Sequence, residues 1–291
     1  MDEKLEKQLI VEVYNNYTKL RLLEEQTDKI CLSAIKRNVN AMAYVKDKNE
    51  KLCLEAVKLN PFALDYIDNQ TEEMCLLAVK KNGLALEYIK NQTEEMCLEA
   101  VKRNGLALQW VQRQSEEVCL EAIKETGLNL RFVKDKTEKI CLEAIRRTPL
   151  SLQYVNNQTE EMCLEAVKRD HSALSFVKHK TFKVYDAAIS KDIYALMYIK
   201  NNSYKLYKLA LKKDISAFYL IDRKNRSEKV CITALDIMYE NKTINKNMLN
   251  HILKLFPNGN IKNLYTKYNF WKYVDFKELN NLGLSEYQML L

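Results

Sequence analysis

The sequence predicts an all-α fold: an α-solenoid of tandem 22-residue helix-turn-helix repeats with helical N- and C-terminal caps. The string TEEMCLEAVKR occurs at residues 93–103 and returns unchanged at residues 159–169. Related units begin at one fixed spacing, for example at Thr71, Thr93 and Ser115, and a fixed period of this size is typical of a solenoid. Glycine and proline number only 5 and 3 in 291 residues, which argues against sheets joined by tight turns.

Nine units cover residues 27–226, and each opens with a residue suited to cap a helix. The opening residues are Thr27, Asn49, Thr71, Thr93, Ser115, Thr137, Thr159, Thr181 and Ser203. The last of these units is two residues longer than the others, and Ser227 then opens a further helix. We therefore assign residues 1–26 to an N-terminal capping helix, 27–226 to tandem helical hairpins and 227–291 to a C-terminal helical cap.

The N-terminal cap is predicted from apolar spacing. In residues 3–25, apolar side chains recur at steps of three and four, which indicates one amphipathic helix. A diverged repeat is the alternative. A terminal element needs one polar face, because no neighbour covers it.

The first helix of each unit has charges that match its dipole. Acidic residues such as Glu94 follow the cap, and basic residues such as Arg103 close the helix. An apolar stripe lies between them at Met96, Cys97, Ala100 and Val101. Because the stripe faces the core, Ala122→Glu, at the position equivalent to Ala100, is expected to bury a charge and destabilise the array.

The second element of each unit begins at another capping residue. These residues are Asn60, Asn82, Asn104, Thr126, Thr148, Asp170, Asp192 and Asp214. Pro61 and Pro149 follow two of them, where the first turn of a helix needs no N–H. The pattern predicts a helix of about eight residues. Its inward-facing side chains are expected to be Leu106, Leu108, Trp110 and Val111.

A strand is the rival interpretation of this second element. Leu84, Leu86 and Tyr88 alternate, as they would in a leucine-rich repeat. Apolar Ala85 and Ile89 occupy the intervening positions, which a half-buried strand would expose. The asparagine-bearing consensus of leucine-rich repeats is also missing. These features favour a helix.

The eight cysteines follow the repeat rather than a disulfide pattern. They are Cys31, Cys53, Cys75, Cys97, Cys119, Cys141, Cys163 and Cys231. Stacked helices lie about 8–10 Å apart, beyond the reach of a disulfide, and equal spacing cannot gather four thiolates around zinc. We therefore predict buried free thiols, with Tyr185 and Tyr207 in the same slot of later units, in a protein of a reducing compartment.

The last third differs in composition. Residues 1–180 hold 28 Lys and Arg against 29 Asp and Glu, whereas residues 181–291 hold 18 against 10 and eleven of the seventeen tyrosines. Helices are expected near 227–240, 244–256 and 261–268, with a turn at 257–260. An apolar cluster that closes the array is expected at Trp271, Tyr273, Val274 and Phe276.

The string TEEMCLEAVKRNGLALQWV resembles a family of short helical repeats of unknown function. Its consensus is roughly T-x-E-x-C-L-x-A-V-x-x-N-G-x-A-L-x-Y-V, and it occurs in giant viruses of amoebae and in some bacteria. The pattern covers residues 27–180 well and 181–226 loosely. The resemblance implies a helical scaffold without catalytic residues. The Lys-, Asn-, Ile- and Tyr-rich composition is similar to that of proteins from AT-rich viral genomes.

No motif for catalysis, a metal or a cofactor is present, so we expect a protein that is not an enzyme. His171, His179 and His251 have no partners at motif spacing, and neither a P-loop nor GxGxxG occurs. The chain has no apolar run of the length that a transmembrane helix needs and no signal-peptide pattern at its start. An intracellular, cytoplasmic protein without membrane contact is expected, in the host cytoplasm if it is viral.

Two surfaces are candidates for binding. Exposed positions of the second helices share one slot yet differ in charge, as a row that recognises a protein or peptide would: Glu87, Gln109, Arg131, Gln153 and Ser175. The alternative is a basic patch for nucleic acid, with tyrosines interleaved: Lys205, Lys208, Lys212, Arg223, Lys224 and Arg226. The basic ends of the first helices are expected to be solvated and paired with glutamates such as Glu99. A monomer and a homodimer both fit.

Overall fold

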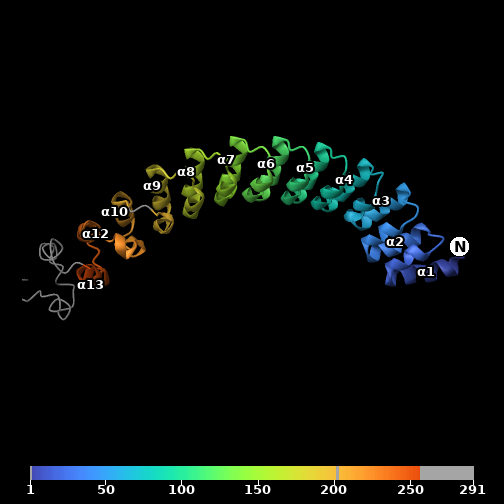
Figure 1. Ribbon diagram of the computed structural model, residues 1–291, viewed down its shortest axis with the longest axis horizontal. Helices are drawn as coiled ribbons and strands as arrows, with labels where there is room; N and C mark the ends of the chain where they lie inside the picture. Colours follow the sequence, from blue (N-terminus) through green and yellow to red (C-terminus); the bar gives the residue numbers. More distant parts are fainter. Residues whose placement is uncertain (1, 201–202, 256–291) are drawn as a thin grey trace, which may run out of the picture. The chain divides into compact units, whose positions relative to one another are not determined.

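The computed structural model describes residues 2–200 and 203–255. Within these residues every regular element is helical and none is a strand, so the leucine-rich alternative is wrong. The chain divides into two compact units, Met1–Asn156 and Asn157–Leu291. In unit 1 the helices α1 to α7 pack side by side in chain order (Figure 1), and in unit 2 α8, α9, α10 and α12 do the same. The predicted α-solenoid is confirmed.

Each repeat consists of an α-helix followed by a 3-10 helix. In unit 1 the α-helices after the first are α2 (Asp28–Arg37), α3 (Glu50–Leu59), α4 (Glu72–Lys81), α5 (Glu94–Arg103), α6 (Glu116–Glu125) and α7 (Glu138–Arg147). Their 3-10 partners are η2 (Val39–Tyr44), η3 (Pro61–Tyr66), η4 (Gly83–Tyr88), η5 (Gly105–Trp110), η6 (Gly127–Phe132) and η7 (Pro149–Tyr154). Consecutive 3-10 helices are neighbours, so each unit has an α row and a 3-10 row.

Unit 2 begins with the same pattern and then departs from it. Its elements are α8 (Glu160–Arg169), η8 (His171–Phe176), α9 (Phe182–Lys191), η9 (Ile193–Tyr198), α10 (Tyr204–Lys213), α11 (Ala217–Leu220), η10 (Arg223–Asn225), α12 (Glu228–Glu240) and α13 (Lys246–Leu255). The two helices expected near 227–240 and 244–256 are thus present. The helix expected at 261–268, the turn at 257–260 and the cluster around Trp271 lie outside the described residues.

The second element is shorter and tighter than the sequence predicts. It is a six-residue 3-10 helix because extended residues bound it, Asn104 before and Val111 after, and the i→i+3 bond from Val111 N to Leu108 O closes it. Its inward face consists of Gly105, Ala107, Leu108 and Val111.

Two of the four side chains expected to face inward therefore do not. Leu106 is half-buried and Trp110 is 38% exposed, so the prediction was wrong for these two. In a 3-10 helix side chains three apart share a face, so Leu108 and Val111 lie on the buried face together with Gly105, and Trp110 does not belong to that set.

The predicted capping residues are confirmed for most helices. The Thr93 hydroxyl accepts from Met96 N (3.3 Å), and the Asn104 side chain accepts from Leu106 N (2.9 Å). Thr148, Ser203 and Ser227 make no such bond. Each cap satisfies an N–H that its helix leaves free.

The core follows the predicted stripe. Met96, Cys97, Ala100 and Val101 are buried, as are their equivalents through unit 1, and Ala122 is fully inaccessible. All eight cysteines are free and buried, as predicted. Burial raises the pKa of Cys31 and Cys97 to about 11 and that of Cys231 to about 12, so these thiols stay protonated at neutral pH.

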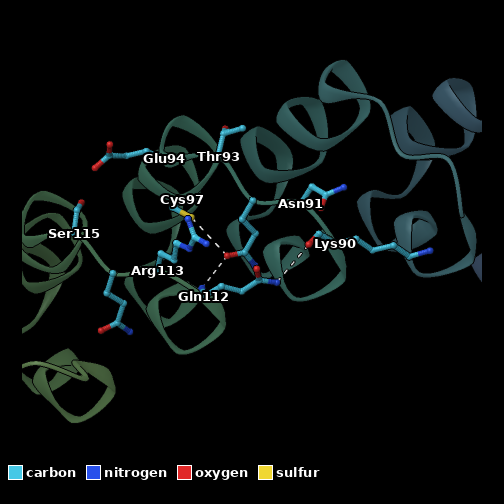
Figure 2. A pocket seen from close by; sticks show the side chains of 10 residues that line it. Lys90, Asn91, Thr93, Glu94, Cys97, Gln112, Arg113 and Ser115 are labelled. Carbon is cyan, nitrogen blue, oxygen red and sulfur yellow. Dashed lines mark hydrogen bonds between the residues drawn. The ribbon is translucent and has the colours of Figure 1, made fainter.

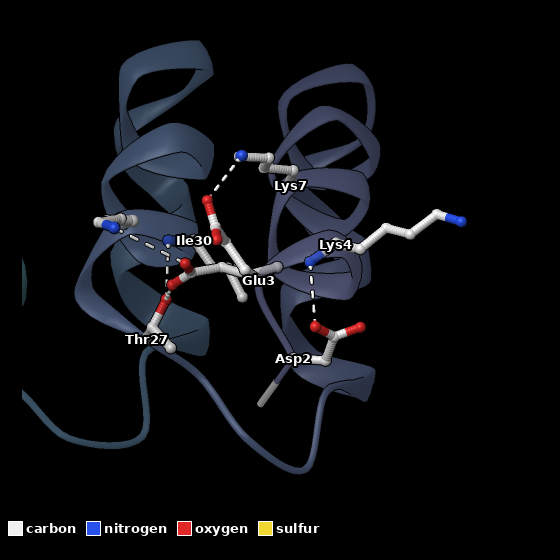
Figure 3. A network of polar contacts seen from close by, with 8 residues as sticks. Asp2, Glu3, Lys4, Lys7, Thr27 and Ile30 are labelled. Carbon is white, nitrogen blue, oxygen red and sulfur yellow. Dashed lines mark hydrogen bonds and ion pairs between the residues drawn. The ribbon is translucent and has the colours of Figure 1, made fainter.

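The N-terminal segment is not one helix over residues 3–25. It consists of α1 (Glu3–Asn15) and η1 (Tyr17–Leu22), the same pair that forms a repeat. Asn16 breaks the helix because its extended backbone and side chain, which accepts from Thr18 N (3.1 Å), start the 3-10 turn. The segment thus has the form of the diverged repeat considered as an alternative. In Figure 3, α1 meets α2 through Thr27, whose hydroxyl donates to Glu6 (2.6 Å).

A glutamine directly before the cap residue joins successive repeats. The Gln92 amide donates to Leu86 O of its own repeat (3.2 Å) and to Trp110 O of the next (3.0 Å). Its oxygen accepts from Gln112 N (2.9 Å) and the Cys97 thiol (3.7 Å), as the dashed lines in Figure 2 show. We call this set of bonds the glutamine clasp. In unit 1 it recurs at Gln26, Gln70 and Gln114.

Candidate functional site

An aromatic side chain ends almost every 3-10 helix and remains partly accessible. In unit 1 these residues are Tyr44, Tyr66, Tyr88, Trp110, Phe132 and Tyr154, and in unit 2 they are Phe176 and Tyr198. Each of the six in unit 1 is half-buried except Trp110, which is exposed. We call the six residues of unit 1 the aromatic ladder.

Some rings of the ladder contact the repeat before them. The Tyr88 ring lies 5.9 Å from that of Phe62 in an edge-on arrangement, and the Tyr66 hydroxyl donates to Asn40 (3.0 Å). Leu84, Leu106 and Leu128, equivalent to Phe62, are half-buried in the following repeats. The 3-10 row of unit 1 therefore presents aromatic and aliphatic surface from repeat to repeat.

The predicted recognition row lies beside the ladder. Glu87, Gln109, Arg131 and Gln153 directly precede ladder residues and are all exposed. Ser175 occupies the equivalent exposed position in unit 2. Burial first, and then the carboxylates of Glu87 and Asp65, raise the pKa of Tyr88.

Most members of this row are engaged only with their own helix. Gln109 and Gln153 donate to the carbonyls of Leu106 (3.1 Å) and Leu150 (3.0 Å). The guanidinium of Arg131 lies 4.4 Å from the centre of the Phe132 ring. These contacts are local and solvent-exposed, so a partner could replace them at low cost.

The basic ends of the α-helices in unit 1 are partly neutralised, as expected. Lys58, Lys102 and Lys124 form ion pairs with glutamates three residues earlier, at 2.7, 3.5 and 2.5 Å. Exposed pairs of this kind contribute little to stability. They do reduce the positive potential of this edge.

The loops between the two rows form polar clefts. One, of about 620 Å³, is lined by Lys90, Thr93, Glu94 and Arg113 among others (Figure 2). A similar cleft one repeat earlier is lined by Asp68, Thr71 and Glu72. Both include a glutamate at the start of an α-helix, where it offsets the positive end of the dipole.

The predicted basic patch of unit 2 is only partly a surface. Lys205, Lys208 and Lys212 on α10 and Arg223 and Lys224 on η10 are exposed. Tyr207, one of the interleaved tyrosines, is buried at 7% exposure in the cysteine slot. Tyr204 is half-buried and shares a hydrogen bond with Thr233 (2.8 Å). Tyr219 is 45% exposed, and its ring lies edge-on to those of Phe218 and His251, with 5.8 and 6.5 Å between ring centres.

Arg226, the last residue of the predicted basic patch, contacts other groups of the protein. It is half-buried, and its guanidinium donates to Ile221 O (2.9 Å) and Tyr219 O (3.2 Å) and contacts His251 Nε2 (2.7 Å). The Phe218 ring lies 4.9 Å below it. Because these groups use the guanidinium, Arg226 holds the loop after α11 in place.

Within the described residues, no three His, Cys, Asp or Glu side chains converge as a metal site. His171 lies 3.8 Å from Asp192, and His179 is exposed. No described helix is both long and apolar enough to cross a membrane.

Sequence reasoning missed three features of these surfaces: the aromatic ladder, the glutamine clasp and the role of Arg226. Each had a signal at the repeat period. An aromatic residue occupies the same position of every repeat from Tyr44 to Tyr198. Gln26, Gln70, Gln92 and Gln114 share the slot before the cap residue, and Arg226 holds that slot before Ser227.

A known protein family matches residues 49–138 of the chain. It is described as a domain of unknown function (DUF4116), and it matches three times in tandem, over residues 49–93, 71–114 and 93–138. Each match spans two of the 22-residue repeats. The predicted resemblance to a repeat family of unknown function is confirmed at this level. No curated protein and no solved structure matches the chain.

Proposed function

We propose that this protein is a non-enzymatic scaffold that binds a partner polypeptide along the 3-10 row of unit 1. The aromatic ladder is the observation that carries the proposal. Tyrosine and tryptophan dominate the binding energy of protein interfaces, because they combine large apolar area with a polar tip. Here such residues recur at a regular spacing on neighbouring elements.

The ladder supplies affinity and the adjoining row supplies selectivity. A partner segment that lies across several 3-10 helices contacts one ring and one member of the row in each repeat. Glu87 and Arg131 carry opposite charges two repeats apart, so the row favours one direction and register of the bound segment. Gln109 between them offers an amide that both donates and accepts.

The proposed place of action is the cytoplasm, that of a host cell if the protein is viral. Eight buried free thiols suit a reducing compartment. The resemblance to repeats of giant viruses supports the host setting. Labelling the protein in living cells and locating it by microscopy tests this part.

Site-directed photo-crosslinking tests the binding surface. A photoreactive residue at position 109 is expected to capture a defined protein from host extract, whereas the same residue at position 95, exposed on α5, is expected to capture none. Equal yields at both positions would contradict the proposal.

A double substitution supplies the energetic test. Trp110→Ser with Phe132→Ser is expected to weaken binding of the captured partner at least tenfold, since such rings each contribute about 2 kcal/mol or more. Tyr14→Ser is the matched control, because Tyr14 is 45% exposed but lies on α1, outside the ladder. Undiminished affinity in the double variant would place the interface elsewhere.

A further inference from the structure

A hollow of about 690 Å³ lies in unit 2, between the repeat at residues 181–202 and the following repeat, which is two residues longer than the others. It is lined by η9 and the two residues after it, by α10, and by the segment from α11 to η10. Its lining includes the exposed side chains of Met197, Lys200, Tyr219 and Lys224, with Asp222 as the one carboxylate. The hollow therefore combines an accessible aromatic ring with two ammonium groups.

Positive charge outweighs negative charge in this part of unit 2. Residues 181–255 hold 14 Lys and Arg against 7 Asp and Glu. Helix α10, which contributes Tyr207 to the lining, has no acidic residue at all. Lys205, Lys208 and Lys212 are exposed, and among the described residues no carboxylate lies within 4.0 Å of their ammonium groups.

The same place in the regular repeats has a different character. The cleft there contains Glu94 at the start of its helix, whereas α10 begins with Tyr204. Glu99 pairs with Lys102 on α5, whereas the equivalent residue on α10 is Leu209. Two carboxylates that would repel an anion are thus replaced in the last repeat.

Arg226 keeps the aromatic wall of the hollow in place. It donates to the carbonyls of Tyr219 and Ile221 and contacts His251 from α13. The backbone that carries Tyr219 is therefore tied to the interior, while the ring stays accessible.

We propose that this hollow and the adjoining face of α10 bind single-stranded nucleic acid. An unpaired base stacks on the Tyr219 ring, and the phosphates on either side lie against Lys200, Lys224 and the α10 lysines. Base–aromatic stacking needs an unpaired base, which a duplex does not offer, and lysines follow a phosphate backbone without regard to sequence. The site is separate from the aromatic ladder of unit 1 and does not depend on the function proposed for it.

Fluorescence anisotropy of the full chain with a labelled 12-nucleotide oligothymidylate, and with its oligouridylate counterpart, tests the proposal. Binding of at least one is expected, and it should weaken with salt by a log–log slope of about −0.7 per phosphate contact. No binding of either at low salt would overturn the proposal. A duplex or an oligoglutamate of equal length that binds as tightly as the single strands would also overturn it.

Substitutions identify the residues. Tyr219→Ala is expected to weaken binding about tenfold, and Tyr219→Phe to retain it, because stacking requires the ring and not the hydroxyl. Full affinity in Tyr219→Ala would reject the stacking site. Circular dichroism melting of each variant separates a binding defect from unfolding.

Replacing the three α10 lysines Lys205, Lys208 and Lys212 by alanine should reduce the magnitude of the salt slope by about 2. The matched control replaces Lys58, Lys102 and Lys124, which already pair with glutamates in unit 1, and should leave the slope unchanged. Equal effects of the two triple variants would show that net charge alone governs binding and would overturn the assignment of a site.

Discussion

The repeats at residues 93–114 and 203–226 occupy the same framework with different surfaces. Their interiors agree, because Ala100 and Ala210 are both fully inaccessible. Their charges do not, since α5 begins with two glutamates and α10 with none. The residue that ends each repeat, which we call its joint, differs too. Gln114 donates to carbonyls of two neighbouring 3-10 helices, whereas Arg226 bonds its own loop and contacts His251. A buried stripe is thus enough to keep the repeat, which leaves its surface and joints free to change.

The largest effect is expected where the two repeats agree. Ala122→Glu and Ala210→Glu both place a charge among fully buried neighbours, and each is expected to cost at least about 3 kcal/mol. Urea unfolding followed by circular dichroism measures the loss. Glu117→Gln, at an exposed position of α6, is the control. A variant that unfolds at the same urea concentration as the parent would show that these alanines do not form the shared interior of the repeats.

A smaller loss of stability is expected on substitution of Gly83, a glycine that has no counterpart in the repeat at residues 203–226. A Cβ on Gly83 would collide with the carbonyl oxygen of Ala100, which is backbone and cannot move aside. Gly83→Ala is therefore expected to destabilise unit 1 by about 2 kcal/mol. At Gly105 the two nearest atoms belong to the side chains of Asn129 and Glu125. The Ala122 carbonyl oxygen would be 2.8 Å away, farther than the Ala100 oxygen is at Gly83, so Gly105→Ala should cost less in the same unfolding experiment. The reverse order would mean that the helix can shift at this junction.

The next loss of stability is expected when a clasp glutamine is replaced. Gln92→Met keeps the volume but removes the clasp bonds to the carbonyls of Leu86 and Trp110 and from Gln112 N, so a loss of about 2 kcal/mol is expected. Gln109→Met, at an exposed position, should be nearly neutral.

Lys136→Gln is the complementary change. The Lys136 ammonium donates to Val133 O within its own repeat (2.7 Å). A glutamine there would complete a clasp and is expected to stabilise unit 1 by about 1 kcal/mol. No gain in the unfolding midpoint would show that the clasp cannot be transferred between junctions.

The smallest effect is a pH dependence of stability that is expected at the Arg226–His251 contact and not at Gln114. Burial first, and then Arg226, Arg223 and Lys254, lower the pKa of His251 below its ordinary value of 6.5. The unfolded chain then binds the proton more readily, so the stability contribution is complete above pH 6.5 and is lost as pH falls through the lower folded pKa. Hydrogen exchange of unit 2 at pH 7.5 and 5.0 should show this loss, and His251→Gln should reduce it. The Gln114 joint contains no group that titrates in this range and should not respond.

The repeat architecture was predictable because hydrophobic spacing and capping residues recur nine times. The buried slots of Cys97 and Ala100 follow from that spacing alone. The exposure of Trp110 was not predictable, because it depends on whether six residues form a 3-10 or an α-helix, and both patterns bury Leu108. The role of Arg226 depends on contacts with His251, which lies on a different helix farther along the chain and which no local pattern reveals.

The glutamine clasp also bears on how such a chain changes in length. Each clasp reaches only the adjoining 3-10 helix. A repeat inserted between two others therefore brings its own clasp, and the clasps of more distant repeats stay unchanged. Duplication or loss of a whole 22-residue repeat in the gene should therefore yield a protein that still folds. An insertion of any other length has to be absorbed in a loop, as the two extra residues are before Ser227.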